Sequence, residues 1–551
     1  SLIDTQIATG TLDVIGNFTS RDILNGGLLT GTGTINAESL FNAGTLNAGT
    51  GGLDVVGDVI LTSIGVLGYS GDALNVDGNV SIDGGLVLGF NGAPTFGQSG
   101  TLINYTGQQI GAFNSISDLP GVLFANVDYS QTGKVTFDIQ AGSYAALVGS
   151  GATANQRAIA GLLDQDRSFF NALSSVYTNT DLLSGNALNV ALNTLSPTNA
   201  LGEIASDLAR TEAVSAQLGR RLGAIGGGGT RGVAVFNTNG NAATAGTLVA
   251  ANGLGAFEAS AAGHASSVTL KEGWGMFADI TYYTGNSAST LLGAESDIDG
   301  FSFTGGVDYE FSRGLTLGAY INYGTGDVEQ TGVFSNGDFT GVAGGIYAQQ
   351  NFGSGMSMSG YFGYGTRDGD LDRTVVTGAA TQSISGNSNT TEYVGGAEVA
   401  FHLPVNEGKI NITPSVRLDY ADFNIDPYSE TGGTAALSIG DQKNTTAQLS
   451  FGALVDIKAD IEPGNIRPVF GGRYVHDLNN TKTRFDASFV NAPGNTATIL
   501  GPVRDQDWFE VEGGIDFNLN ENMTGAVHVT QTIERSDLDY TSISAKIRYK
   551  F

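Results

Sequence analysis

The sequence has no cysteine among its 551 residues, which excludes a disulfide scaffold, thiolate metal sites and cysteine nucleophiles. A chain without cysteine suits passage through an oxidising periplasm, although many cytosolic proteins also lack cysteine. Proline is scarce, at 10 residues, whereas glycine is abundant, at 82. No apolar run reaches the roughly 18 residues of a transmembrane helix. This does not exclude a membrane β-barrel, whose strands need only about 9–11 residues of alternating polarity.

Positive charge is also scarce. The chain has 25 Lys and Arg against 54 Asp and Glu, and its formal net charge is −29. This balance argues against nucleic-acid binding, which requires a basic patch. Histidine is rare too, and none of the four (His264, His402, His476 and His528) has the spacing of a zinc motif.

The sequence lacks the residue constellations that catalysis requires. It contains no nucleotide-binding motif and no Gly-x-Ser-x-Gly elbow. Asp368, Asp370 and Asp372 begin like a calcium loop, but Arg373 and Ala379 replace the glycine and glutamate of an EF-hand. We expect a solvated acidic loop there. We predict no enzyme activity, no catalytic residue, no cofactor and no metal site.

Period-two alternation is abundant, and it runs from residue 271 to the end of the chain. In the last thirteen residues, every second residue from Ile543 to Phe551 is apolar and the intervening residues are polar. Such alternation indicates strands with one face in an apolar medium and one face in water. The pattern predicts twelve strands, at 272–283, 297–311, 315–325, 337–351, 356–367, 388–403, 409–423, 442–457, 465–477, 504–519, 523–534 and 539–551.

The connections between these strands alternate in length. Short connections interleave with long ones, and the long ones lie at 284–296, 326–336, 368–387, 424–441 and 478–503. Outer-membrane barrels have short periplasmic turns, longer external loops and an even number of strands, whereas a soluble sandwich has no reason to keep this parity. We therefore predict a twelve-stranded antiparallel transmembrane β-barrel over residues 271–551.

Residues 1–145 contain a repeated phrase, which reads LDVIGNF at 12–18, LDVVGDV at 53–59 and LNVDGNV at 74–80. Each copy places apolar residues two apart, with a glycine where the backbone turns or packs closely. The spacing fits multiples of a coil of about 20 residues. Stacked coils would bury the apolar face in a continuous core, which predicts a right-handed parallel β-helix. An irregular sandwich is the alternative.

The composition changes between these two regions. Apolar residues recur at helical spacing over 159–170 and 204–222, and a run of four glycines ends the second segment. We predict an α-helical linker over 146–229. Small and polar residues at 230–270 predict a flexible connector to the barrel.

Several stretches resemble the autotransporter family. A repeat of the autotransporter passenger is similar to Asn42-Ala-Gly44-Thr-Leu46. The start of the helix between passenger and barrel is similar to Asn155-Gln156. The translocator barrel is similar to Gly273-Trp274-Gly275 and to the terminal Ile547-Arg-Tyr549-Lys-Phe551. The resemblance covers essentially the whole chain. It implies a monomeric autotransporter of type V secretion in the outer membrane of a Gram-negative bacterium, with the end of its β-helical passenger on the cell surface. Because the chain opens without a basic start or an apolar signal core, we expect it to begin within a longer protein.

The polar faces of the predicted strands carry charges that we expect to line the barrel lumen: Asp308, Glu310, Arg417, Asp419, Asp456, Glu510, Glu512 and Asp516. The last linker helix carries Arg210, Arg220 and Arg221. We expect this helix to lie in the pore and plug it, with its arginines facing lumen carboxylates. The alternative is that it packs against the base of the passenger. Self-cleaving members of the family use an Asn-Asn pair in this helix; the stretch 211–222 has no asparagine, so the resemblance implies a passenger that stays attached.

The resemblance implies a barrel that exports its own passenger and anchors it at the cell surface. A surface adhesin or scaffold on a barrel anchor is the alternative function, and the β-helix and linker helices argue against a diffusion porin. The implied partners are outer-membrane lipid and lipopolysaccharide, periplasmic chaperones, and a host or cell-surface ligand of the passenger. The barrel-assembly machinery would read the C-terminal signal, formed by Ile547, Tyr549 and Phe551.

Overall fold

The structure is a computed structural model, and the residues it describes form two compact units. The described residues are 3–226, 274–289, 294–311, 314–331, 334–352, 355–461, 464–479, 483–501, 504–520, 523–535 and 537–549. The solenoid unit comprises Ser1–Ala152, Ile159–Leu192 and Val376–Thr381, and the barrel unit comprises Thr153–Ala158, Asn193–Val375 and Gln382–Phe551. The connector predicted at 230–270 lies outside the described residues.

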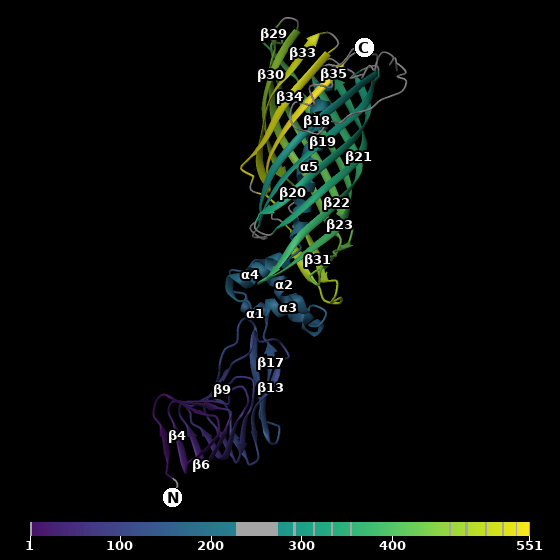
Figure 1. Cartoon of the computed structure of the whole chain (residues 1–551). Coiled ribbons are helices and arrows are strands. Elements are labelled where there is room, and N and C mark those ends of the chain that lie inside the picture. Colours follow the sequence, from purple (N-terminus) through teal and green to yellow (C-terminus); the bar gives the residue numbers. More distant parts are fainter. Residues whose placement is uncertain are drawn as a thin grey trace, which may run out of the picture. The chain divides into compact units, whose positions relative to one another are not determined.

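The solenoid unit begins with a parallel β-helix, the fold expected from the repeats (Figure 1). Its first sheet stacks β1 (Thr5–Ile7), β4 (Asp22–Asn25), β6 (Thr34–Asn42), β8 (Leu53–Leu61), β10 (Leu74–Asp77) and β13 (Ser99–Tyr105), with β3 (Asn17–Thr19), β11 (Val80–Ile82) and β14 (Gln109–Gly111) paired beside them. Its second sheet stacks β2 (Thr11–Val14), β5 (Leu28–Gly31), β7 (Thr45–Asn47), β9 (Val66–Tyr69), β12 (Gly85–Leu88) and β15 (Ser115–Ile116).

The second and third copies of the repeated phrase lie in register on adjacent coils. Leu53 of β8 pairs with Leu74 of β10, and Val59 pairs with Val80 of β11. The first copy differs, because its Leu12 belongs to β2 in the second sheet. Coil length explains the difference. Contacts between equivalent side chains give the coil lengths: 17 residues from Asn25 to Asn42, 21 from Asp54 to Asn75, and 29 from Asn75 to Asn104. Because the coils differ in length, residues at a constant spacing in the sequence do not all lie on the same sheet.

Ladders of identical side chains hold the coils together. Leu29, Leu46, Leu67 and Leu86 pair in register through the second sheet, and each is at most 1 % exposed. Burial of each leucine is worth roughly 1.5–3 kcal/mol. Asn25 donates to the Oδ1 atom of Asn42 over 2.6 Å in the same core. Such a ladder satisfies amide groups that would otherwise be buried at a cost.

The last coil is covered by antiparallel strands. β17 (Lys134–Ala141) pairs with β13 on one side and with β16 (Leu123–Asp128) on the other. The change from parallel to antiparallel pairing closes the β-helix at this end.

Short helices follow the β-helix. They are α1 (Tyr144–Leu147), α2 (Ala154–Gln165), η1 (Asp166–Phe169), α3 (Ser174–Thr180) and α4 (Gly185–Leu195), and the long α5 (Thr198–Gly226) comes after them. In the solenoid unit Arg167 pairs with both carboxylate oxygens of Asp181, each at 2.9 Å, and lies 4.2 Å from the ring centre of Tyr177. Burial raises the pKa of the Tyr144 phenol, which donates to Asp181, and the negative charge of Asp181 raises it further. No helix in the described part of the chain combines the length and apolarity needed to cross a membrane.

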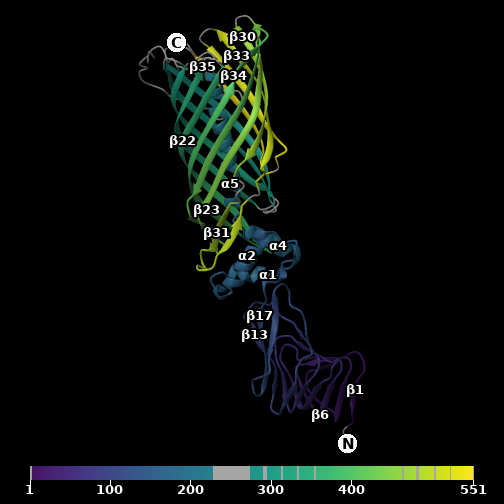
Figure 2. The same ribbon diagram turned by 180° about the vertical axis from the view of Figure 1, so that it is seen from behind.

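The barrel unit is a closed ring of twelve antiparallel strands, as predicted (Figures 1 and 2). The strands are β18 (Trp274–Ser289), β19 (Ala294–Glu310), β20 (Leu315–Thr331), β21 (Ser335–Phe352), β22 (Met356–Thr377), β23 (Ala380–Phe401), β25 (Ile410–Ile425), β28 (Gln442–Ile457), β30 (Gly464–Asp477), β33 (Asp507–Asn520), β34 (Met523–Ile533) and β35 (Asp539–Tyr549). β18 pairs with β35 and β23 pairs with β25, which completes the ring. β24 (Leu403–Val405) and β29 (Ala459–Ile461) add short pairings at its end.

Three of the predicted long loops are wrong. Residues 284–296, 326–336 and 368–387 largely extend the strands into long hairpins. Asp368, Asp370 and Asp372 consequently lie on β22 and not in a loop. The outward face of these extensions is polar, as at Asp368, Asp370 and Asp372, because beyond the bilayer it meets water and not lipid, and this removed the alternation signal. The two other long connections contribute β26 (Tyr428–Ser429), β27 (Leu437–Ile439), β31 (Arg484–Phe489) and β32 (Ala497–Leu500), which form a small antiparallel sheet.

Candidate functional site

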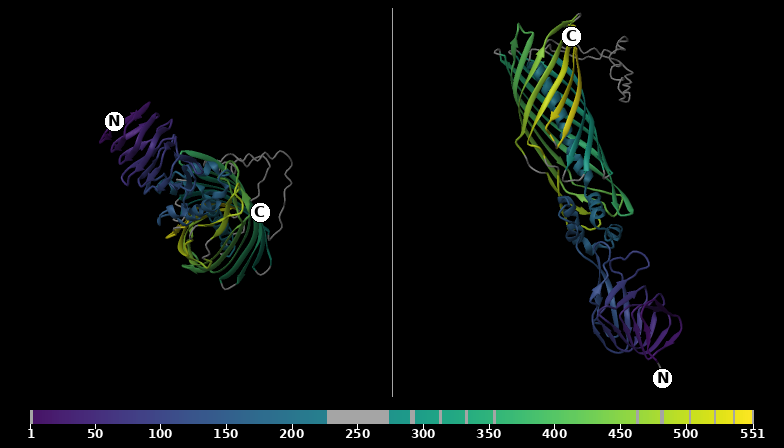
Figure 3. Two further views of the ribbon diagram at one scale, coloured as in Figure 1. Left: turned by 90° about the horizontal axis from the view of Figure 1, so that it is seen from below. Right: turned by 90° about the vertical axis from the view of Figure 1, so that its left-hand side faces the viewer.

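The candidate site is the barrel lumen together with α5, which lies inside it. Figures 1 and 2 and the right panel of Figure 3 all show α5 within the ring of strands. Its side chains are buried along most of the length from Thr198 to Leu222. At about 1.5 Å per residue, the 29 residues of α5 extend about 43 Å, more than the roughly 30 Å hydrocarbon core of a bilayer.

One face of α5 carries a stripe of polar residues that meet the barrel wall. The stripe consists of Glu203, Asp207, Arg210, Gln217 and Arg221, spaced by one or two turns. Spacings of three, four and seven place them on the same side of a helix. Acidic residues occupy the first part of the stripe and basic residues the second.

The acidic part of the stripe faces arginine on the wall. The guanidinium of Arg367 on β22 lies 3.1 Å from Glu203 and 2.6 Å from Asp207. Its carbon also lies 4.4 Å from the ring centre of Phe339. All three charged side chains are at most 3 % exposed. Buried charges of this kind are tolerated only when paired.

The basic part of the stripe faces carboxylates. Arg210 pairs with Glu392 of β23 at 2.5 Å and donates to Asn322 over 3.1 Å. Arg221 pairs with Asp308, the first of the predicted lumen charges, which also accepts from Tyr347 over 2.6 Å. The stripe therefore matches the wall along its length in sign as well as in position.

The other predicted arginine, Arg220, lies at the side of the stripe. It donates to Thr281 over 3.3 Å and lies 4.0 Å from Asp279. Between the charged groups, Gln217 donates to the carbonyl of Ser302 over 3.0 Å. A neutral side chain thus fills the gap between Arg210 and Arg221.

The remaining predicted lumen charges lie mostly away from α5, in pairs along the opposite wall. Arg417 is the exception: it donates to the Ser215 carbonyl over 2.6 Å and pairs with Asp419 at 2.7 Å. The other contacts are Asp456 with Arg467 at 2.8 Å, Glu510 with Arg473 at 3.3 Å, Glu512 with His528 at 2.5 Å and Asp516 with His528 at 2.7 Å. Glu310 lies half-buried at the end of β19.

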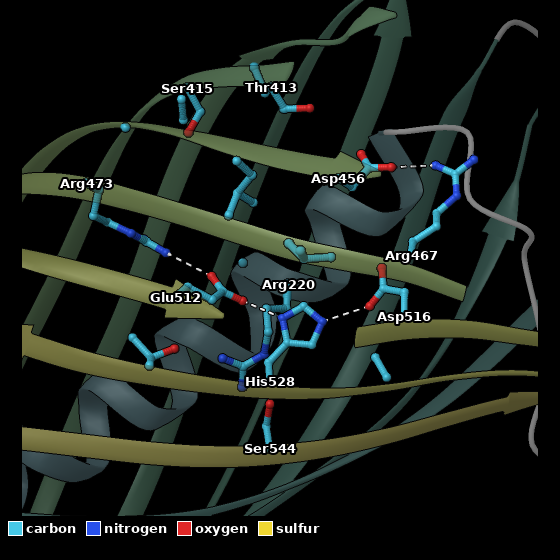
Figure 4. Close-up of a pocket in the computed structure, with 18 of the residues that line it drawn as sticks. Arg220, Thr413, Ser415, Asp456, Arg467, Arg473, Glu512, Asp516, His528 and Ser544 are labelled. Atoms are coloured by element: carbon cyan, nitrogen blue, oxygen red, sulfur yellow. Dashed lines mark hydrogen bonds and ion pairs between the residues drawn. The ribbon is translucent and has the colours of Figure 1, made fainter. Parts of the chain in front are cut away.

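These pairs border a cavity of about 390 Å³ between α5 and the wall. Figure 4 shows Arg220 of α5 facing Glu512, Asp516 and His528 across this space. Leu454, the apolar exception on the polar face of its strand, also lines the cavity. No group of three or more His, Asp or Glu side chains among the described residues is arranged to hold a metal ion.

The outside of the ring is apolar and ends in an aromatic belt. The belt consists of outward-facing tyrosines from different strands, each 37–46 % exposed: Tyr282, Tyr323, Tyr364, Tyr393, Tyr420 and Tyr474. Beyond the belt, Asp299, Asp327, Asp338 and Asp370 occupy directly paired positions on adjacent strands. Aromatic belts mark the interface of an outer-membrane barrel, so the acidic row lies on its aqueous side.

The C-terminal signal is only partly described. Ile547 on β35 is 40 % exposed. Tyr549 is the last residue of β35, and Phe551 lies outside the described residues.

The Asn155-Gln156 pair has a clear structural role in the barrel unit. Gln156 and Thr153 exchange backbone–side-chain hydrogen bonds of 2.7 and 3.1 Å, the capping box that starts α2. Asn155 donates to the Leu500 carbonyl over 3.0 Å and accepts from its amide over 2.9 Å. Asn155 therefore binds the free backbone edge of β32 much as another strand would.

Reasoning from the sequence missed half of the contacts of α5. It did not single out Glu203, Asp207 or Glu212 on the helix, or Arg367 and Glu392 on the wall. The helical spacing of the acidic residues was a usable signal. The wall residues carried only a weak one, because their partners are more than a hundred residues away in the chain.

Comparison with known proteins gives a family for the barrel region. Residues 276–530 match the family model of the autotransporter β-domain. No curated protein matches the chain. Among solved structures, the chain is similar to the translocator domain of the autotransporter NalP from Neisseria meningitidis, at 17 % identity over 63 % of this chain and 99 % of that chain, with a TM-score of 0.43. It is also similar to the transport unit of the autotransporter AIDA-I from Escherichia coli, at 14 % identity over 56 % of this chain and 96 % of that chain, with a TM-score of 0.37. The family match therefore identifies residues 276–530, which lie in the twelve-stranded ring, as an autotransporter β-domain, the barrel of an outer-membrane protein.

Proposed function

We propose that the barrel exports the N-terminal solenoid across the outer membrane and retains it at the cell surface. The observation that carries this proposal is the position of α5, whose backbone joins the preceding 197 residues to the barrel through the lumen. A chain that enters the lumen at one end and continues into the barrel at the other has the topology of an exported segment.

The direction of α5 supports an external solenoid. Near the start of the helix, Asn199 donates over 3.1 Å to Glu430, which belongs to the long connection between β25 and β28. Near its end, Arg221 meets Asp308, three residues before the short turn after β19. Long connections face outward and short turns face the periplasm in outer-membrane barrels. Residues before α5 therefore emerge on the outer side.

Ion pairs support retention after export. Buried pairs link α5 to β19, β22 and β23, and removal of one partner of such a pair costs roughly 3–5 kcal/mol. The helix also lacks asparagine over 211–222, where self-cleaving relatives use an asparagine pair. In our proposal, α5 remains in the barrel as both a tether and a plug, and the protein has no catalytic role.

The proposed partners follow from the surfaces described above. The apolar outer face and the tyrosine belt suit outer-membrane lipid and lipopolysaccharide. The C-terminal strand would be read by the barrel-assembly machinery after periplasmic chaperones have delivered the chain. A ligand of the solenoid would make the protein a surface adhesin or scaffold, and Leu24 and Phe41, paired and exposed on adjacent coils, offer an apolar contact for it.

Protease treatment of intact cells tests the proposal. Antibodies against residues 1–140 and against the barrel would follow the two parts of the chain. We expect loss of the N-terminal signal and survival of a barrel fragment of about thirty kilodaltons, the size of a barrel domain. Lysed cells treated in parallel control for protease activity. An N-terminal segment that resists protease in intact cells but not in lysed cells would place the solenoid in the periplasm and refute export.

A further inference from the structure

α5 does not fill the lumen evenly. Its polar stripe binds strands between β19 and β23, whereas the 390 Å³ cavity lies mainly toward β25, β28, β30, β33 and β34. We call this cavity the vestibule. Its lining is charged and polar, and it has room for on the order of ten waters. A plugged barrel thus keeps a hydrated space along one side of its plug.

The vestibule opens at the short-turn end. Side chains near that end are accessible: Asp516 is 47 % exposed and Arg467 is 31 % exposed. Deeper in the lumen, exposure falls to 15 % for Glu510 and 6 % for Arg417. Water can therefore enter from the end that carries the short turns.

A second cavity continues the path toward the outer end. It measures about 40 Å³ and shares Arg417, Arg473 and Glu510 with the lining of the vestibule. The two cavities meet at these three side chains. Glu212 of α5 also lines the second cavity.

Arg535 lies next to the second cavity, through its contact with Glu212. Its guanidinium donates to Glu212 over 2.6 Å and to Asp537 over 2.8 Å, and its carbon lies 4.1 Å from the ring centre of Trp508. The side chains of Arg535, Asp537 and Glu212 are 2 %, 3 % and 9 % exposed. In contrast to the mouth of the vestibule, this end of the path is sealed.

Glu534 and Arg535 lie directly after β34, in a connection at the outer end of the barrel. Glu534 has φ of +58°, a left-handed conformation that costs a non-glycine residue energy. Among the described residues, Arg535 meets α5 through a hydrogen bond to Glu212, and the ion pairs that hold the helix to β19, β22 and β23 do not involve Arg535.

We propose that Arg535 is a latch on a path for small ions and hydrophilic solutes that runs beside the seated plug helix. With the latch closed, the vestibule is a blind space. With Arg535 withdrawn, the two cavities join the outer solution, and the barrel conducts while α5 remains in place. The proposal needs α5 in the lumen, and it does not depend on whether the solenoid is exported.

The first test is single-channel conductance of the full chain in planar bilayers, in the wild type and in Arg535→Ala. We expect the latch variant to open more often by a factor of about ten or more, because a buried carboxylate that loses its partner draws in water. The conductance step should stay well below that of a chain lacking residues 200–228, because the helix still occupies the lumen. Arg484→Ala, which removes an exposed arginine from another outer connection, is the matched control and should leave openings unchanged.

The second test uses the absence of native cysteine. Ser415→Cys places a thiol in the vestibule, and Val416→Cys places one on the lipid-facing side of the same strand. A charged methanethiosulfonate reagent is added outside proteoliposomes. Only the barrels whose solenoid is digested by external protease are scored, because in those barrels the outer end faces the reagent. We expect the vestibule thiol to react only when Arg535→Ala is also present, and the lipid-facing thiol to react in neither background.

Glu212→Gln covers the possibility that Arg535→Ala does not fold. It removes the charge on the helix side and keeps an acceptor, so it should raise opening by less than Arg535→Ala. Trp508 fluorescence in a Trp274→Phe background, which leaves one tryptophan, reports release of the guanidinium. Unchanged openings and an unreactive vestibule thiol in either folded latch variant would overturn the proposal. Equal effects from Arg484→Ala would overturn it as well.

Discussion

The strongest prediction concerns Arg367, which holds the acidic half of α5. Substitution by methionine keeps an unbranched side chain beside Phe339 but removes the guanidinium and its charge. Glu203 and Asp207, whose side chains are 0 % and 3 % exposed, are then two buried carboxylates without their guanidinium partner. Loss of one member of a buried charge network costs roughly 3–5 kcal/mol. At about 1.4 kcal/mol per factor of ten, the ratio of seated to unseated helix should fall by two to four powers of ten.

The assay is conductance of the full chain in planar bilayers, scored as the fraction of time in the fully open state. Arg367→Met should raise this fraction strongly, with steps as large as those of a chain that lacks residues 200–228. This separates an unseated helix from an open latch, which gives smaller steps. Arg484→Met, at an exposed position, controls for the loss of positive charge.

A triple variant decides whether charge is the cause. Arg367→Met combined with Glu203→Gln and Asp207→Asn replaces the whole network by neutral groups of similar shape. Such replacement is often neutral for stability, so closure should return. If Arg367→Met stays as closed as the wild type, or if the triple variant is no more closed than Arg367→Met, then ion pairing does not hold the helix.

Three further predictions concern other parts of the chain. Gly219→Ala should displace the end of the Arg417 side chain, because a Cβ there would lie 1.8 Å from the Arg417 Nη1 atom; since this flexible side chain can shift, the open fraction should rise by less than in Arg367→Met. Gly161→Ala, with no atom within 4 Å, should be neutral or stabilising. Gly57→Ala should prevent the β-helix from folding, because Gly57 has φ of +131° and a Cβ there would lie 1.7 Å from the Ala37 carbonyl oxygen. The measurement is protease resistance of residues 1–145. Gly16→Ala, where a Cβ would have free space, is the control, and equal resistance of the two variants would contradict the prediction. Asn155→Ala should release Leu500 and make the connection at 483–501 more sensitive to protease, because the lost hydrogen bonds cost about 1–3 kcal/mol of stability. Gln156→Ala is the control and should weaken only the start of α2. Equal protease sensitivity in both variants would count against the binding of the β32 edge by Asn155.

The sequence was sufficient to predict the strands that have a different medium on each face. A strand in a membrane barrel has lipid on one face and water on the other, so period-two alternation predicted all twelve strands. The same rule failed beyond the tyrosine belt, where Asp368 to Asp372 of β22 looked like a loop because neither strand face meets lipid there. In the β-helix, coils of unequal length moved Leu12 to a different sheet from Leu53, which no fixed repeat length anticipates.

The contacts of the site were harder to predict than its location. Arg210, Arg220 and Arg221 were identified because charge at helical spacing is visible locally. Their partners depend on which strand faces each turn of the helix, and Glu392 lies 182 residues from Arg210 in the chain. Strand register and barrel closure fix that distance, and neither is encoded near the helix itself.

The order of charges along α5 specifies the direction and depth of the helix in the barrel. Glu203 and Asp207 meet Arg367, while Arg221 meets Asp308. A helix inserted in the reverse direction would bring arginine to Arg367 and carboxylates to Asp308, and each buried like-charge contact is strongly unfavourable. A shift of one turn, about 5.4 Å, would leave the same charges facing neutral positions such as Ser302 and Thr304. A single seated state is therefore favoured over its neighbours by several buried pairs at once, and a helix plugs a pore reliably only when it has such a unique position.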